Sequence, residues 1–199
     1  MPTIKLFEFA PTRSARARWT LLEAGLEFES VETRPQDPDL LKAHPLGKLP
    51  AAVIDGKPVF ESAAIATAIA DAVPEKNLIA KPGTWSRVLH DQWVSFALTE
   101  LEAWAWSTAI NTFVLPEDQR IPAVFEQNAA LYRRNAEAME QALTGAAYLV
   151  DDRFSVTDII VGYAVNWGRL NGYLDGFDNL NAYLDRLFTH EHCTLNPGD

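Results

Sequence analysis

The spacing of apolar residues along the chain changes near residue 73. Before that point, short runs in which apolar and polar residues alternate, as in strands, are interspersed with runs in which apolar residues have helical spacing. Residues 3–9 and 27–32 alternate, whereas residues 14–24 place apolar side chains three or four positions apart. Because two parallel strands need a crossover between them, these segments predict a β-α-β unit.

Residues 37–72 extend this unit. The predicted segments are a short helix opened by Asp37-Pro38-Asp39 that ends before Pro45, strands over 51–54 and 58–60, and an alanine-rich helix over 62–72. Between the two strands stands Asp55-Gly56, a dipeptide typical of tight hairpins. The predicted order over about 72 residues is therefore β-α-β-α-β-β-α.

The second half of the chain has only helical patterns. Residues 73–83 hold two prolines and a glycine and are predicted to be a linker. Apolar residues then recur every fourth position from Trp85 towards Phe113, and Trp85, Trp93 and Trp104 are expected to pack into a core. Further helices are predicted over about 120–143, from a capping box at Ser155-Val156-Thr157-Asp158, and over about 179–188. This pattern predicts an all-helical bundle.

Composition narrows the class of protein. With 199 residues, 48% of them hydrophobic, the chain can form one large domain or two small ones. Its net charge of −10 opposes binding to nucleic acid. The single cysteine, Cys193, excludes an intrachain disulfide and fits a reducing compartment. No apolar run approaches the roughly 18 residues of a membrane span, so a cytoplasmic protein without a membrane partner is expected.

Two segments carry candidate chemistry. In the first, Thr12 and Ser14 stand with three arginines where the first strand meets the first helix, and N–H and hydroxyl groups at a helix N-terminus favour an anion. The alternative is that one of the two hydroxyls is an ordinary helix cap. In the second, Pro50 precedes a short strand, and a cis proline there could leave the preceding backbone free for a ligand; a trans turn is the alternative. His190-Glu191-His192-Cys193 is expected to be a solvated tail, and no metal is expected.

Nearly the whole chain resembles the cytosolic glutathione transferase family. The resemblance is carried by Arg18 to Glu29, by the turn Pro45-Leu46-Gly47-Lys48-Leu49-Pro50, by Glu61-Ser62 about eleven residues later, and by Ser155 to Asp158. It implies a thioredoxin-like glutathione-binding domain over residues 1–75, an all-helical domain over 84–199 and a homodimer.

The resemblance also implies roles for individual residues. Leu49, before a cis Pro50, would pair with the cysteinyl part of glutathione, and Glu61 and Ser62 would hold its γ-glutamyl end. Lys48, and less surely His44, would face the glycine carboxylate. On the helix that lines the acceptor site in similar proteins lie Trp104, Trp106, Thr108 and Phe113, although core packing is an alternative role for each of them.

Members of this family activate the thiol with a tyrosine, a serine or a cysteine near the end of the first strand. Here the first tyrosine is Tyr132 and the only cysteine is Cys193, so a hydroxyl or amide type remains, similar to certain bacterial and fungal members. Ser14 is favoured over Thr12 as the activating residue. The expected function is that of a glutathione transferase, in which the thiolate attacks a small apolar electrophile in detoxification. A glutathione-dependent isomerase and a noncatalytic binding protein are the alternatives.

Overall fold

The computed structural model describes residues 1–196 and begins with a small α/β unit. Its elements are β1 (Ile4–Glu8), α1 (Ser14–Ala24), β2 (Glu29–Glu32), α2 (Leu40–Ala43), β3 (Ala51–Ile54), β4 (Lys57–Phe60) and α3 (Ser62–Asp71). The predicted order β-α-β-α-β-β-α is confirmed. As the sequence suggests, Asp55 and Gly56 form the turn between β3 and β4, and both have positive φ angles.

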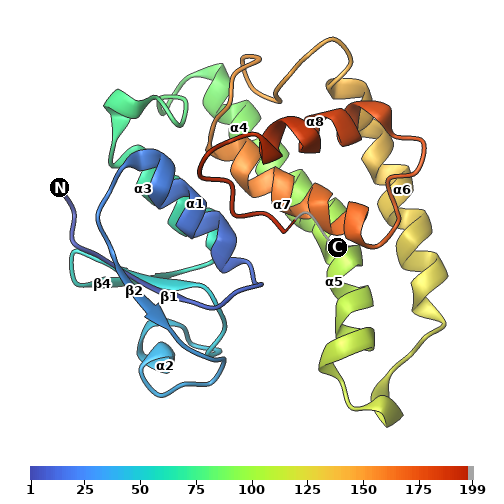
Figure 1. The fold of residues 1–199 in the computed structure, drawn as a ribbon, viewed down its shortest axis with the longest axis horizontal. Coiled ribbons are helices and arrows are strands. Elements are labelled where there is room, and N and C mark those ends of the chain that lie inside the picture. Colours follow the sequence, from blue (N-terminus) through green and yellow to red (C-terminus); the bar gives the residue numbers. More distant parts are fainter. Residues whose placement is uncertain (197–199) are drawn as a thin grey trace.

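The four strands form one mixed sheet in the order β2-β1-β3-β4. β1 is parallel to β2 and antiparallel to β3, and β3 is antiparallel to β4. Helices α1 and α3 lie together on one side of the sheet and α2 lies on the other (Figure 1). This is the thioredoxin-like arrangement that the sequence predicts.

Helix α1 packs on both halves of the chain. Leu21 joins Ile65 and Ile69 of α3 in the core beside the sheet. Trp19, fully buried on another side of the same helix, belongs to the core of the helical half. The helix ends where Gly25 adopts a left-handed conformation at φ 65°, which glycine adopts at little cost. Because side chains of α1 pack into both cores, the N-terminus of this helix is fixed against both halves of the chain.

The second half contains only helices among the described residues. They are the 3-10 turn η1 (Pro74–Lys76), α4 (Trp85–Phe96), the π-helical η2 (Ala97–Glu102), α5 (Ala103–Ala109), the π-helical η3 (Ile110–Val114), the 3-10 turn η4 (Glu117–Gln119), α6 (Val124–Ala142), α7 (Val156–Leu170) and α8 (Asp178–Phe188). The all-helical prediction is confirmed. No helix within residues 1–196 has both the length and the hydropathy to cross a membrane.

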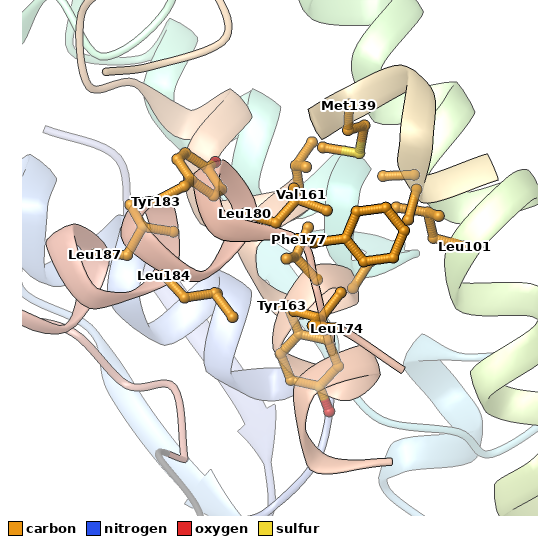
Figure 2. Close-up of a cluster of buried hydrophobic side chains, with 14 of the residues drawn as sticks. Leu101, Met139, Val161, Tyr163, Leu174, Phe177, Leu180, Tyr183, Leu184 and Leu187 are labelled. Carbon is orange, nitrogen blue, oxygen red and sulfur yellow. The ribbon is translucent and has the colours of Figure 1, made fainter. Parts of the chain in front are cut away.

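Helix α7 is the centre of the helical half. Figure 2 shows Leu180 of α8 beside Val161 of α7, with Met139 of α6 close by and Tyr183, Leu184 and Leu187 further along α8 in the same cluster. A Cβ atom on Gly168 of α7 would lie 2.1 Å from the Tyr132 hydroxyl, so only glycine allows these helices to approach so closely. The prediction for Trp85 is wrong: this residue begins α4 and is 73% exposed, whereas Trp93 and Trp104 pack against the core.

The predicted capping box is present at the start of α7. The Ser155 hydroxyl accepts a hydrogen bond from the Thr157 N–H, and the Asp158 carboxylate accepts one from the Ser155 N–H at 2.9 Å. Asp158 also accepts a bond from the Tyr183 hydroxyl at 3.0 Å. A carboxylate thus joins the start of α7 to α8 inside the core.

We expect this carboxylate to make stability depend on pH. Burial raises the pKa of Asp158 to about 6, against an opposing effect of its hydrogen bonds to Tyr183 and Ser155. Because the folded chain then holds this proton more tightly than the unfolded chain, Asp158 favours folding most below its unfolded pKa of 3.8, and this contribution is lost as the pH rises through about 6. A shift from 3.8 to about 6 corresponds to about 3 kcal/mol.

Urea unfolding of wild type and of Asp158→Asn measures this effect. Asparagine keeps the size of the side chain but cannot ionise. The wild type should lose about 3 kcal/mol relative to Asp158→Asn between about pH 3 and about pH 7. A difference that stayed constant over this range would show that the carboxyl group titrates alike in the folded and unfolded chains.

The segment after α8 is not the solvated tail that the sequence suggests. His190 stacks on Phe154 with ring centroids 3.9 Å apart, and Cys193 packs against the helical core. The Thr194 hydroxyl then donates to the Ala15 carbonyl of α1 at 2.8 Å. The C-terminal segment therefore lies across both halves of the chain.

Candidate functional site

Strand register brings the predicted segments to one end of the sheet. Phe7 near the end of β1 pairs with Ala51 at the start of β3, and Ala51 in turn pairs with Phe60 at the end of β4. The loop after β1, the residues before β3 and the residues after β4 consequently emerge side by side. The first of these contains Thr12 and Ser14, the second Leu49 and Pro50, and the third Glu61 and Ser62.

The hydroxyl groups of Thr12 and Ser14 lie 2.8 Å apart in the loop before α1. Thr12 donates to the carbonyl of Phe9, so its only hydroxyl proton is used there. Ser14 must therefore be the donor between the two hydroxyls, and its oxygen accepts the Phe9 N–H at 3.3 Å. Ser14 is the first residue of α1 rather than its cap, because Arg13 occupies the cap position, although its side chain makes no capping hydrogen bond to the helix.

These bonds distinguish the two candidate hydroxyls. The Thr12 proton lies on a backbone carbonyl, and the Ser14 proton lies on a neutral hydroxyl, which is the weaker acceptor of the two. The N–H groups of Thr12 and Arg13 have no hydrogen-bond acceptor within residues 1–196. An anion at this loop could thus take the Ser14 proton and also meet free backbone donors.

The residues before β3 present an open backbone. Leu49-Pro50 is a cis peptide bond, as the sequence suggests, and so is Ala10-Pro11. Neither the N–H nor the C=O of Leu49 has a partner among the described residues. Lys48 is exposed, whereas His44 is buried with its ring 4.9 Å from that of Phe60.

The His44 side chain stabilises the turn that contains Lys48. Its Nδ1 accepts the Leu46 N–H at 3.0 Å, and burial lowers the pKa of its imidazole. A neutral ring that already serves as an acceptor gives little attraction to a carboxylate. Lys48 is therefore the better placed of the two for that role.

Glu61 and Ser62 differ in their surroundings. Glu61 is exposed and has a φ of 70°, a conformation that a residue with a side chain rarely adopts and that is frequent at functional sites. Ser62 is buried at the start of α3, and its oxygen accepts a hydrogen bond from Nη1 of Arg16 at 3.1 Å. Because Ser62 accepts this bond, its own proton is left to donate to another group.

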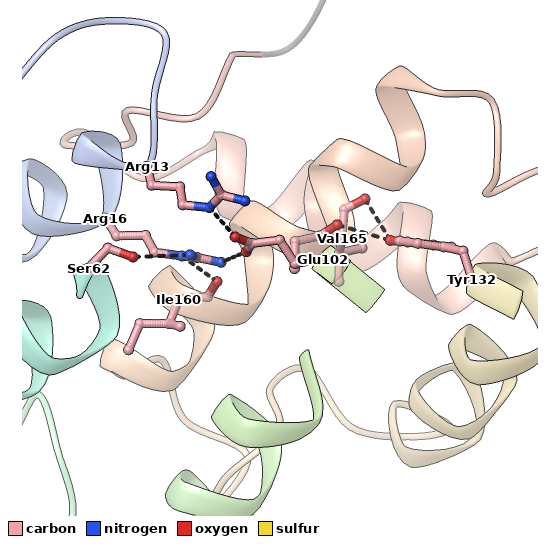
Figure 3. Close-up of polar contacts among 8 residues, drawn as sticks. Arg13, Arg16, Ser62, Glu102, Tyr132, Ile160 and Val165 are labelled. Atoms are coloured by element: carbon pink, nitrogen blue, oxygen red, sulfur yellow. Dashed lines mark hydrogen bonds and ion pairs between the residues drawn. The ribbon is translucent and has the colours of Figure 1, made fainter. Parts of the chain in front are cut away.

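Arg16 belongs to a buried charge cluster that joins the two halves of the chain. Figure 3 shows Glu102 of η2 between two guanidinium groups, paired with Nη2 of Arg16 and with Nε of Arg13. Arg16 also donates from Nε to the Ile160 carbonyl at 2.9 Å. Burial alone would raise the pKa of Glu102, but the charges of Arg16 and Arg13 outweigh burial and hold that pKa below its ordinary value.

Comparison with known proteins fits this geometry. Residues 2–71 match the family model for the glutathione S-transferase N-terminal domain. The glutathione S-transferase GstA of Escherichia coli O157:H7 is 26% identical, and the match covers 92% of each chain. The chain belongs to the cytosolic glutathione transferase family.

Two further comparisons span nearly the whole transferase fold. Protein LigF of Sphingobium is 29% identical over 93% of this chain and 89% of its own length. A glutathione S-transferase of Methylobacillus flagellatus, whose structure was solved with glutathione bound, superposes with a TM-score of 0.83 over 96% of both chains. At 21% identity the second likeness shows the shared fold alone.

The four predicted acceptor residues of this transferase lie in different surroundings. Trp106 stacks on Trp167 of α7, with centroids 6.0 Å apart. Thr108 instead lies inside the helical half, where it meets the Tyr173 hydroxyl and the Asn128 side chain, each at 3.1 Å. Trp104 packs against the helical core, and its indole N–H has no hydrogen-bond partner among residues 1–196. Phe113, 81% exposed, lies near the end of η3.

A cavity of about 320 Å³ lies between the loop after β1 and helix α7. Thr12 and Ser14 line one side, and Tyr163 and Trp167 line another. Burial raises the pKa of Tyr163 to about 12, so its hydroxyl stays protonated at neutral pH. The cavity places an apolar space beside the two hydroxyls, and none of the four predicted acceptor residues lines it.

Sequence reasoning missed several residues around this candidate site. Glu102 and Trp167 are distant in sequence from the loop that they contact, and no local motif marks either of them. Arg13 and Arg16 were visible only as part of a basic run at the start of a helix. The presence of two arginines three positions apart, on one side of a buried helix, is the signal that could have indicated a carboxylate partner.

Proposed function

We propose that this protein binds glutathione, holds its thiol as a thiolate at the start of α1 and transfers it to a small apolar electrophile. The observation that carries this proposal is the register that sets Ser14, the open backbone of Leu49 and the pair Glu61-Ser62 at one end of the sheet. Residues 1–75 are then the glutathione-binding domain, residues 73–83 the linker and residues 84–199 the helical domain. The last three residues of that range lie outside the described part of the chain.

Within this proposal each group around the site has a separate task. Leu49 offers one N–H and one C=O, which suits the peptide-like cysteinyl part of glutathione. Glu61 attracts the α-amino group of the γ-glutamyl end, and the Ser62 proton donates to its carboxylate. Lys48 attracts the glycine carboxylate. The cavity beside Ser14 takes the electrophile.

The proposed chemistry is the activation of a thiol. A thiol with a pKa of about 8.5 is only a few per cent thiolate at neutral pH, and the thiolate is the nucleophile. Lowering this pKa by about two units takes about 2.7 kcal/mol. A hydrogen bond to a charged group supplies about 1.5–3 kcal/mol. The thiolate then forms a carbon–sulfur bond, and a leaving group departs with the electron pair of the bond that breaks.

Two measurements separate this proposal from its alternatives. Retention on immobilised glutathione, with elution by free glutathione, tests binding. Steady consumption of glutathione with chlorodinitrobenzene identifies a transferase, whereas an isomerase uses glutathione without net consumption and a noncatalytic protein only retains it. The proposal extends to a cytoplasmic homodimer, which sedimentation equilibrium tests: a mass of about 22 kDa at micromolar protein would contradict the dimer.

Glu61→Gln should weaken glutathione binding by about tenfold or more. The exchange removes one charged partner of the α-amino group, and a charge-assisted hydrogen bond contributes about 1.5–3 kcal/mol. Isothermal titration with glutathione measures the affinity. Glu75→Gln, which removes an exposed carboxylate from η1, is the matched control and should leave the affinity unchanged. If Glu61→Gln lowered only the melting temperature, Glu61 would serve the start of α3 and not the ligand.

A further inference from the structure

The cluster of Arg13, Arg16 and Glu102 carries an unmatched positive charge. Two guanidinium groups share one carboxylate, and no other ion pair involves either arginine within residues 1–196. Both arginines are held at the interface between the halves, where water screens charge poorly. One net positive charge therefore remains at the loop before α1.

Arg13 is the member of the cluster that can meet a ligand. The Arg16 side chain is fully buried and already bonds to Ser62, Ile160 and Glu102, whereas 26% of the Arg13 side chain is exposed. Arg13 uses only Nε towards Glu102, and its two terminal nitrogens have no partner among the described residues (Figure 3). These nitrogens keep several N–H donors free.

Arg13 is also held in a fixed orientation. Its guanidinium carbon lies 4.5 Å from the ring centroid of Trp106 and 4.9 Å from that of Trp167. A guanidinium fixed by a carboxylate and by two aromatic rings loses little freedom when it binds an anion. Trp167 also lines the cavity beside Ser14, so Arg13 contacts a residue of the cavity wall without lining the cavity itself.

We propose that Arg13 is the anion-binding residue of the acceptor site, and that the preferred electrophiles are aromatic compounds that carry a carboxylate. This inference rests on the proposed function and names its substrate class. The free donors of Arg13 match a planar carboxylate, and Trp167, which lines the cavity, provides apolar surface there for the aromatic part. Glutathione has its own partners at Lys48, Leu49, Glu61 and Ser62 in the proposed site, which leaves Arg13 to the second substrate.

Paired substrates test this assignment. Chloronitrobenzoate and its methyl ester have the same leaving group, and only the first carries a charge. For the wild type and for each variant, the kcat/KM of each substrate is divided by the rate constant of that substrate's uncatalysed reaction with glutathione. The resulting ratio for the acid is then compared with the ratio for the ester. In the wild type the acid should be preferred, and Arg13→Gln should lower this preference by about tenfold.

Arg169→Gln is the matched control. Arg169 lies on α7 two residues beyond Trp167, pairs with one carboxylate, Asp185, and lies over one aromatic ring, Phe188. The Arg169→Gln exchange removes the same formal charge as Arg13→Gln and leaves the cluster intact, so the preference for the acid should persist. Equal losses in both variants would trace the preference to overall charge and overturn the assignment. A wild type that does not favour the acid would overturn it without any variant.

Binding measurements separate this inference from the proposed function. Nitrobenzoate and nitrobenzamide are titrated against the quenching of tryptophan fluorescence, with no turnover required. The wild type should bind the acid more tightly, and Arg13→Gln should lose that difference while it keeps its retention on immobilised glutathione. Loss of glutathione retention with an unchanged acid preference would place Arg13 at the glutathione site instead. If the protein is not retained on immobilised glutathione but still prefers the acid through Arg13, the transferase proposal is refuted and the anion site at Arg13 still stands.

Discussion

Glu102→Ala should lower the free energy of unfolding by about 3–5 kcal/mol, because removal of one partner of a buried ion pair leaves an uncompensated charge. Here the loss leaves two arginines, Arg13 and Arg16, without their shared carboxylate, and Arg16 has no exposed surface through which water could solvate it. The same change releases the contact between α1 and η2. Urea unfolding followed by tryptophan fluorescence measures the effect.

Asp185→Ala is the control for this experiment. Asp185 also pairs with an arginine, Arg169, but its side chain is 67% exposed. Exposed ion pairs contribute about 0–1 kcal/mol, so this variant should remain close to the wild type. If Glu102→Ala were no more destabilising than Asp185→Ala, water would screen the charge cluster between the halves. The unmatched charge at Arg13 would then attract an anion no more strongly than an exposed arginine does.

Local signals predicted most of the fold. Alternation and helical spacing placed the elements of the first half, and the turn residues Asp55 and Gly56 placed the hairpin. The capping box at Ser155 placed the start of α7, with Asp158 in the role of the usual glutamate or glutamine. Each of these features depends on residues that are close together in the sequence, so the sequence alone predicts it.

Features that depend on distant contacts were not predicted. Trp85 shares the spacing of the core residues that follow it, but it lies in the first turn of α4, where its side chain is 73% exposed. Their position after the last helix predicts a solvated tail for His190 and Cys193, yet His190 stacks on Phe154 and Cys193 packs against the helical core. In each case the neighbours come from elsewhere in the chain, and local spacing carries no information about them.

The candidate site shows the same division. The helix start at Ser14 and the turn before β3 could be located from the sequence, because strand ends and prolines mark them. The direction of each hydroxyl proton could not, since it depends on how the loop folds back on Phe9. That direction decides which of Thr12 and Ser14 can donate to a thiolate.

Ser14→Ala should raise the pKa of the bound glutathione thiol by roughly one to two units. Ser14 points its proton at the neutral Thr12 oxygen, and a thiolate is a stronger acceptor that can draw this proton to itself. Loss of one charge-assisted bond of about 1.5–3 kcal/mol corresponds to a shift of that size. The ultraviolet absorbance of the thiolate, followed against pH at saturating glutathione, measures the pKa. Glutathione affinity at low pH, where the thiol is neutral, should change little.

Thr12→Val should shift the same titration in the opposite direction or leave it unchanged. Valine keeps the shape of the side chain but removes the oxygen that accepts the Ser14 proton, so Ser14 becomes free to donate to sulfur without breaking another bond. A rise in the pKa with Thr12→Val and none with Ser14→Ala would assign activation to Thr12. If neither variant moved the titration, the free N–H groups of Thr12 and Arg13 at the start of α1 would be the groups that hold the thiolate.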